Sequence, residues 1–189
     1  MLLDYASTHL NAILIYKESD MVLHANSDTA QLTMPEAGSF YEDNFYLSDW
    51  PSPSPIKTNP ERNGTIHMEC KTILNVVSSE AEYETCGISN NGKTSIGMRS
   101  DLITLDHKQP ATPLKTDNSM TEGFINSMMK PKHSRIWDMK LHWLRNKEVL
   151  EQMRVYWDKL TNNEADYFTK ITPKFTIIKC VLGIYIPRI

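Results

Sequence analysis

Cysteine is scarce in this sequence, and its placement limits the chemistry that the chain can use. The 189 residues include three cysteines, Cys70, Cys86 and Cys180, which lie far apart and form no C-x-x-C pair. The sequence therefore indicates neither a disulfide framework nor a zinc site of closely spaced thiolates. A reducing compartment fits this pattern best.

The sequence also lacks an excess of positive charge and a long apolar segment. Its formal net charge is -3 and its pI is about 6.1, so nucleic-acid binding would have to come from a local basic patch. No basic region followed by an apolar run opens the chain, and the late apolar stretch 177–186 is interrupted by Lys179. We therefore expect neither a signal peptide nor a membrane span.

Strand-like and helix-like segments alternate along the chain, whose hydrophobic content of 40% suits one domain with a single core. The expected strands are 21–27, 40–47, 65–77, 113–117 and 155–157. Four helices are expected. The first is capped by Ser78 or Ser79, the second covers 119–129, the third covers 136–152, and a short last helix is capped by Asn162 or Asn163. A proline-rich insertion, 48–63, separates two strands, and we expect residues 90–92 to weaken or kink the first helix. This order predicts an α/β fold with a mixed five-stranded sheet flanked by helices, in which an antiparallel meander is followed by helical crossovers.

Four carboxylates stand where such a fold can bring them together. They are Asp28 at the end of the first strand, Glu82 early in the first helix, Asp117 at the end of the fourth strand and Asp166 at the start of the last helix. Four clustered carboxylates repel one another unless cations bind between them. Oxygen ligands suit Mg²⁺, and a pair of such ions can activate water and stabilise the leaving oxygen of a phosphodiester.

Short motifs around these carboxylates resemble one family. Residues 76–83 read V-V-S-S-E-A-E-Y and resemble an S-S-T-E-A-E-Y signature, and residues 116–119 read T-D-N-S and resemble a D-N strand end. Further on, K-H-S-R-I-W-D-M-K-L-H-W-L-R at 132–145 is similar to K-H-I-D-x-R-x-H-F-V-R, and N-E-A-D-Y-F-T-K at 163–170 is similar to L-A-D-x-F-T-K. In this order the motifs resemble the ribonuclease H domain of copia-type LTR retrotransposon Pol polyproteins, over residues 2 to about 173.

This resemblance implies a ribonuclease H-like domain over 21–173, preceded by a linker from reverse transcriptase, 1–20, and followed by an atypical tail, 174–189. It implies that the RNA strand of RNA–DNA hybrids is hydrolysed with two Mg²⁺ ions, or Mn²⁺ as a substitute, held by Asp28, Glu82, Asp117 and Asp166. Glu82 rather than Glu80 takes the role of the family's helix carboxylate. The implied partners are the hybrid and the reverse transcriptase domain of the same polyprotein, in a cytoplasmic virus-like particle or the nucleus.

A basic segment coincides with the third of these motifs. It contains six positive charges between 130 and 147 against Asp138 alone, and we expect it to hold the phosphates of the hybrid. Its members are Lys130, Lys132, Arg135, Lys140, Arg145 and Lys147. We expect Trp137 and Trp143 to belong to the core rather than to stack on bases.

Two alternatives stay open at the level of sequence. The proline-rich loop is longer than the family leads us to expect and the tail beyond Pro173 does not resemble a family ending, so the chain can also be a decayed, catalytically silent fragment that at most binds nucleic acid. The segment G-I-S-N-N-G-K-T at 87–94 satisfies the phosphate-binding pattern G-x-x-x-x-G-K-[ST] of nucleoside triphosphatases. That pattern requires a buried strand before it, whereas a charged helix start precedes it here.

Overall fold

The computed structural model describes residues 13–34, 38–50, 63–74, 79–126, 135–158 and 184–185. Its main feature is a five-stranded sheet in the order β4-β3-β2-β5-β6. The strands are β2 (Val22–Met34), β3 (Gly38–Ser48), β4 (Thr65–Thr72), β5 (Thr112–Thr116) and β6 (Met153–Trp157). β2, β3 and β4 pair antiparallel, whereas β5 joins β2 and β6 joins β5 in parallel. The mixed sheet expected from the sequence is thereby confirmed.

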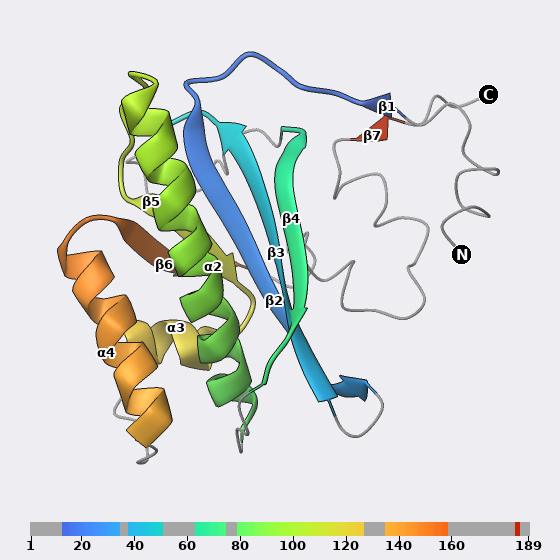
Figure 1. Ribbon diagram of the computed structural model, residues 1–189, viewed down its shortest axis with the longest axis vertical. Helices are drawn as coiled ribbons and strands as arrows, with labels where there is room; N and C mark the ends of the chain where they lie inside the picture. Colours follow the sequence, from blue (N-terminus) through green and yellow to red (C-terminus); the bar gives the residue numbers. More distant parts are fainter. Residues whose placement is uncertain are drawn as a thin grey trace.

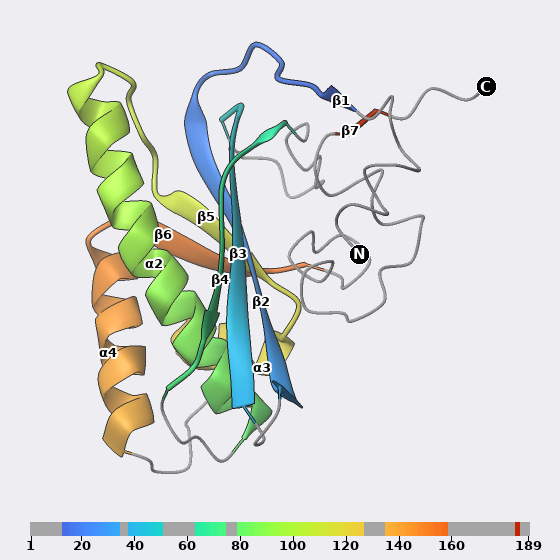
Figure 2. The same cartoon turned by 45° about the vertical axis from the view of Figure 1, so that its right-hand side comes forward.

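In the described part of the chain three helices accompany the sheet: α2 (Glu80–Thr104), α3 (Ser119–Ile125) and α4 (Arg135–Val149). Figures 1 and 2 show α2 and α4 side by side on one face of the sheet, with α3 behind the lower part of α2. Side-chain caps begin α2 and α3. Ser79 Oγ accepts a hydrogen bond from the N–H of Glu82 at 3.3 Å, and Asn118 Oδ1 accepts one from the N–H of Thr121 at 3.0 Å. These caps satisfy amide groups that have no partner inside the helix.

The core lies between this helical layer and the sheet. Ala25, Phe45 and Leu114 of the sheet are fully buried and belong to the same cluster as Ile88 and Leu144 of the helices. Each large apolar side chain buried there contributes roughly 1.5–3 kcal/mol relative to its exposed state. The predicted core position of Trp137 is confirmed, because only 6% of this residue is exposed.

Two helices differ in length from the sequence prediction because of contacts that periodicity does not show. α2 continues through 90–92, where Asn91 Nδ2 donates to Ser27 Oγ at 2.6 Å and to the carbonyl of Glu42 at 3.1 Å. These buried hydrogen bonds fix a residue of weak helix propensity inside the helix. α4 ends at Val149, because Glu151 takes the left-handed conformation (φ 52) and Gln152 N–H donates to the carbonyl of Lys147. This Schellman-type turn leads the chain into β6.

β2 is also longer than expected and continues past Asp28 to Met34. The extension pairs with β3 as a hairpin that closes with Met34 opposite Gly38. A register irregularity lies between Ala30 and Met34, where Leu32 has a positive φ of 54. Asp28 therefore lies within a strand, not at its end.

The terminal segments meet in a second, two-stranded sheet. β1 (Ile13–Leu14), within the predicted linker, pairs antiparallel with β7 (Ile184–Tyr185), within the predicted tail. Residues 51–62 of the predicted insertion and the predicted last helix lie outside the described residues. Among the described residues, no helix is both long and apolar enough to cross a membrane.

Candidate metal centre

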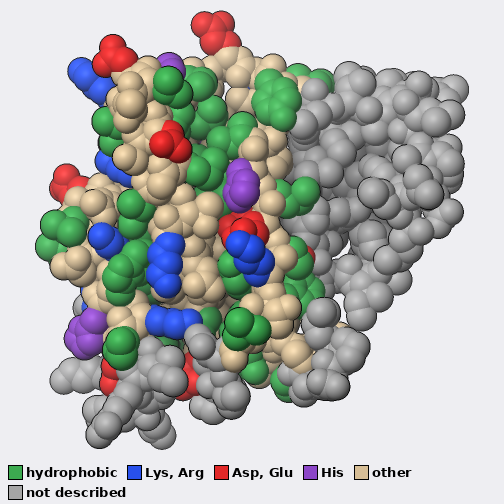
Figure 3. Space-filling model, viewed as in Figure 1, with side chains coloured by type: hydrophobic (Ala, Val, Ile, Leu, Met, Phe, Trp, Pro, Cys, Tyr) green, Lys and Arg blue, Asp and Glu red, His purple; other side chains and the backbone are tan. Residues whose placement is uncertain are grey.

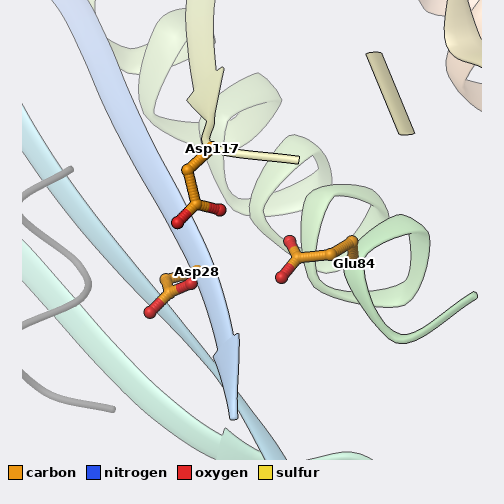
Figure 4. Close-up of side chains that lie close together, drawn as sticks. All are labelled: Asp28, Glu84 and Asp117. Carbon is orange, nitrogen blue, oxygen red and sulfur yellow. The ribbon is translucent and has the colours of Figure 1, made fainter. Parts of the chain in front are cut away.

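Three carboxylates from separate elements converge on one point. Asp28 comes from β2, Glu84 from the first turns of α2, and Asp117 from the residue directly after β5 (Figure 4). Oxygens of the three groups all lie within 4.8 Å of one another. Asp28 and Glu84 are buried, whereas Asp117 is partly exposed, so the cluster is reachable on the side of Asp117.

Strand register explains why the two aspartates meet. β2 and β5 are parallel neighbours in which Asn26 lies opposite Lys115. Asp28 and Asp117 each follow these partners by two residues, so both side chains stand at the same level of the sheet and point to the same face. Asn118 then caps α3 and ends β5 at this point.

Helix periodicity explains why Glu84 joins them. Successive residues of a helix are turned by about 100°, so Glu84 lies on the same side of α2 as Ala81 and Ile88. Ala81 and Ile88 are both in the core against the sheet. Glu84 therefore lies on the face of α2 that packs against the sheet in the core.

The environment of Glu84 opposes a negative charge. Burial raises the pKa of Glu84 to about 8, and the charges of Asp28 and Asp117 act in the same direction. The Thr29 hydroxyl, which donates to Glu84 Oε1 at 2.6 Å, partly offsets this rise. Glu84 Oε2 is buried and has no hydrogen-bond partner among the described residues.

These features fit a divalent cation. Mg²⁺ binds oxygens at about 2.1 Å, so opposite ligands of one octahedral ion are about 4.2 Å apart, close to the spacing of the three carboxylates. A cation would also supply the missing partner of Glu84 Oε2 and remove the repulsion within the cluster. Asp28, Glu84 and Asp117 can thus hold an ion that activates water or stabilises an anionic leaving group.

The sequence prediction named Asp28 and Asp117 but chose Glu82 from the helix. Glu82 is buried at the start of α2, about 200° around the helix from Glu84, and it is not part of the three-carboxylate cluster. Its predicted role stays a prediction. Asp166 lies outside the described residues. The spacing of Ala81, Glu84 and Ile88 is the sequence signal that could have indicated Glu84.

Of the six residues of the predicted basic segment, the structure describes the side chains of Lys140, Arg145 and Lys147, so its role in binding the hybrid stays a prediction. Lys130 and Lys132 lie outside the described residues, and so does the side chain of Arg135, although its backbone begins α4. Arg145 donates to the backbone carbonyls of Phe124 and Ile125 and thereby ties α4 to α3. Lys140 Nζ lies 3.0 Å from Cys86 Sγ, and Lys147 Nζ lies 5.7 Å from the ring centre of Trp143.

The phosphate-binding pattern at 87–94 is not a phosphate-binding loop. All eight residues lie inside α2, where their amide groups belong to the helix. A triphosphate loop needs free amides between a strand and a helix. The alternative of a nucleoside triphosphatase through this segment was therefore wrong.

Comparison with known proteins identifies solved structures with a similar fold. No protein-family model matches the chain, and the curated proteins include no match. Among solved structures, LC11 ribonuclease H1 isolated from compost by a metagenomic approach is similar with a TM-score of 0.55 and 10% identity, over 77% of this chain and 91% of that chain.

Two further structures are similar. The complex of the LC11 enzyme with an RNA/DNA hybrid gives a TM-score of 0.52 at 10% identity, over 76% of this chain and 91% of that chain. The ribonuclease H domain of prototype foamy virus gives a TM-score of 0.44 at 8% identity, over 88% of this chain and 91% of that domain. The likeness to the LC11 structures shows that this chain has a ribonuclease H-like fold.

Proposed function

We propose that this protein hydrolyses the RNA strand of RNA–DNA hybrids in a reaction that depends on divalent cations. The observation that supports this most directly is the convergence of Asp28, Glu84 and Asp117 within 4.8 Å of one another. The cluster contains no serine, cysteine or histidine nucleophile, so its chemistry fits attack by a water molecule. The ribonuclease H-like fold and the solved complex of an RNA/DNA hybrid with a similar structure support the choice of substrate.

In this proposal the carboxylates hold and orient the cations. Thr29 fixes the rotamer of Glu84 through its hydrogen bond of 2.6 Å. Bound Mg²⁺ would lower the pKa of a water molecule and stabilise negative charge on the leaving oxygen. We propose two ions, as the motif resemblance implies, with Asp166 as a further ligand of the second.

The finer assignment to copia-type retrotransposons is also a proposal. It is supported by the ordered motifs, of which S-S-E-A-E-Y directly precedes Glu84 and T-D-N-S contains Asp117. A reverse transcriptase domain encoded directly upstream in the same reading frame would be the partner. Sequencing the genomic locus checks this, because an unrelated upstream region would contradict the assignment.

Cleavage of a labelled RNA–DNA hybrid by the full chain in Mg²⁺ tests the activity. Duplex DNA and single-stranded RNA serve as substrate controls, and excess EDTA serves as the metal control. We expect Asp117→Asn and Glu84→Gln each to lower the rate by at least a hundredfold, as for the loss of an electrostatic catalytic group. A folded chain that binds the hybrid but cuts none of it in Mg²⁺ or Mn²⁺ would be the silent remnant.

A further inference from the structure

A groove of about 450 Å³ lies on the outer side of α2, between the edge strand β4 and α4. It is lined by one lysine from each of these three elements: Lys71 from β4, Lys93 from α2 and Lys140 from α4. In Figure 3 basic side chains gather over the middle of this face. Lys93 is nine residues from Glu84, which places the two on opposite sides of α2, so the groove is separate from the carboxylate cluster.

The groove has an uncompensated positive charge. Glu69 is the one carboxylate among its lining residues, and it is already occupied by an ion pair with Lys71 and a hydrogen bond of 3.2 Å from the Tyr41 hydroxyl. Three lysines against one glutamate give a local net charge of two, within a chain whose net charge is -3. This local excess therefore differs in sign from the chain as a whole.

Neutral groups hold the other two lysines in place. Lys140 Nζ lies 3.0 Å from Cys86 Sγ, and Lys93 Nζ lies 5.9 Å from the ring centre of Trp143. Neither contact neutralises an ammonium charge, and neither lysine forms an ion pair within the described part of the chain. Both cations are thus positioned while their charge stays available to a ligand.

The donor set favours phosphate over carboxylate. A planar carboxylate is matched best by the fork of an arginine, whereas lysines act as point charges that surround a phosphate from several directions. The groove is lined by three lysines and no arginine, and Asn90 and Thr72 add neutral donors. Lys147 Nζ, which lies 5.7 Å from the centre of the same Trp143 ring, adds a further positive charge on α4.

We infer that this groove binds the phosphodiester backbone of a nucleic-acid strand, at a surface distinct from the carboxylate cluster. The inference goes beyond the proposed hydrolysis, because it concerns binding without metal and does not require the cluster to be catalytic. Lys93 and Thr94, which belong to the pattern that suggested a triphosphate loop from sequence, would contact the strand here as side chains on the surface of α2.

The test is binding of a fluorescein-labelled single-stranded DNA of mixed sequence to the full chain in EDTA, measured by anisotropy between about 50 and 200 mM salt. The Lys71→Gln/Lys93→Gln double variant is compared with Lys17→Gln/Lys108→Gln, which removes the same charge at exposed positions elsewhere. We expect the groove variant to bind roughly three- to tenfold more weakly, and its slope of log K against log salt to fall by about 1.4, or 0.7 per lost contact. Thermal melts establish that both variants are folded.

Equal weakening in both variants would mean that net charge alone governs binding, and no weakening in the groove variant would mean that the groove is not used. Either result overturns the inference. Competition by poly-glutamate as effective as that by unlabelled DNA would overturn the preference for phosphate. Because the assay contains no metal, an inactive chain that still binds through the groove would refute the proposed hydrolysis and leave this inference standing.

Discussion

The hydroxyl of Thr29 donates to the carboxylate of Glu84 with 2.6 Å between Oγ1 and Oε1. This contact joins β2 to α2 one residue after Asp28, so the strand that provides one acidic residue also orients another. It leaves Oε2 of Glu84 buried and without a hydrogen-bond partner in the described structure. A cation at this point would therefore stabilise the packing of α2 on the sheet.

Glu84→Gln should remove the stabilisation of the folded chain by Mg²⁺. In the wild type we expect saturating Mg²⁺ to raise the free energy of unfolding by about 2.7 kcal/mol at a concentration a hundredfold above Kd. In EDTA the variant should be more stable than the wild type at neutral pH, because it removes a carboxyl group whose raised pKa makes burial unfavourable in the folded chain. Thermal unfolding with and without Mg²⁺ measures both effects.

Glu82→Gln is the matched control for that experiment, since it changes the same residue type two positions earlier in α2. If the cluster of Asp28, Glu84 and Asp117 is the cation site, Glu82→Gln should keep most of the Mg²⁺ response. Loss of the response in Glu82→Gln alone would instead support the sequence-based choice of Glu82.

Acid should destabilise the fold through His24. Burial lowers the pKa of His24 to about 4, below its ordinary value of 6.5, and the nearby charge of Lys115 acts in the same direction. The folded state therefore binds this proton less readily than the unfolded state. The stability that the neutral ring contributes is complete above pH 6.5 and is lost as the pH falls from 6.5 to 4.

Urea unfolding of the wild type and His24→Gln between pH 7.5 and 4.5 measures this dependence. The wild type should lose about 3 kcal/mol more than the variant over this range, as an upper value. His142→Gln, at an exposed position, is the control and should follow the wild type. Parallel curves for the wild type and His24→Gln would contradict the prediction.

Two glycines of α2 should respond to alanine in opposite directions. A Cβ at Gly97 would meet nothing within 4 Å, so Gly97→Ala should raise the free energy of unfolding by roughly 0.5–1 kcal/mol through helix propensity. A Cβ at Gly87 would lie 2.7 Å from Thr29 Cγ2, so Gly87→Ala should lower the free energy of unfolding by about 1–3 kcal/mol.

Denaturant unfolding of the two variants gives the comparison. Because Gly87→Ala presses on Thr29, we also expect it to weaken the Mg²⁺ response of Glu84, whereas Gly97→Ala should leave that response unchanged. A stabilising effect of alanine at position 87 would mean that α2 and β2 are not in this close contact.

Trp137 should couple energetically to Thr85. Its Nε1 donates to Thr85 Oγ1 at 2.9 Å, and its ring meets Phe124 edge to face at 5.0 Å between centroids. Trp137→Phe should therefore cost about 1–3 kcal/mol. A double-mutant cycle with Thr85→Val should give a coupling energy of about 0.5–1.5 kcal/mol, and additive effects would exclude the hydrogen bond.

The sequence by itself determined the order of the elements and the nature of the sheet. Alternating apolar residues specify strands at a period of two, and helical crossovers between parallel strands bring Asp28 and Asp117 to the same level of the sheet. The local pattern assigned each aspartate to the strand to which it belongs or which it follows, whereas the parallel pairing of β2 with β5 brings the two together. The expected capping of α2 by Ser78 or Ser79 is confirmed for Ser79 for the same reason, since capping is a local interaction.

The packing of the helices decided which helix carboxylate faces the sheet, where the spacing of Ala81, Glu84 and Ile88 was the sequence signal, and it alone decided which lysines share a surface. Glu80, Glu82 and Glu84 are the same residue type in the first turns of α2. Because Ala81 and Ile88 pack in the core, Glu84 is the one of the three that joins the cluster. Likewise α2 passes through 90–92 because Asn91 finds partners on β2 and β3. Lys71, Lys93 and Lys140 are distant in sequence and meet because β4, α2 and α4 pack together. Each of these outcomes depends on contacts between segments far apart in the chain, which the local sequence pattern does not record.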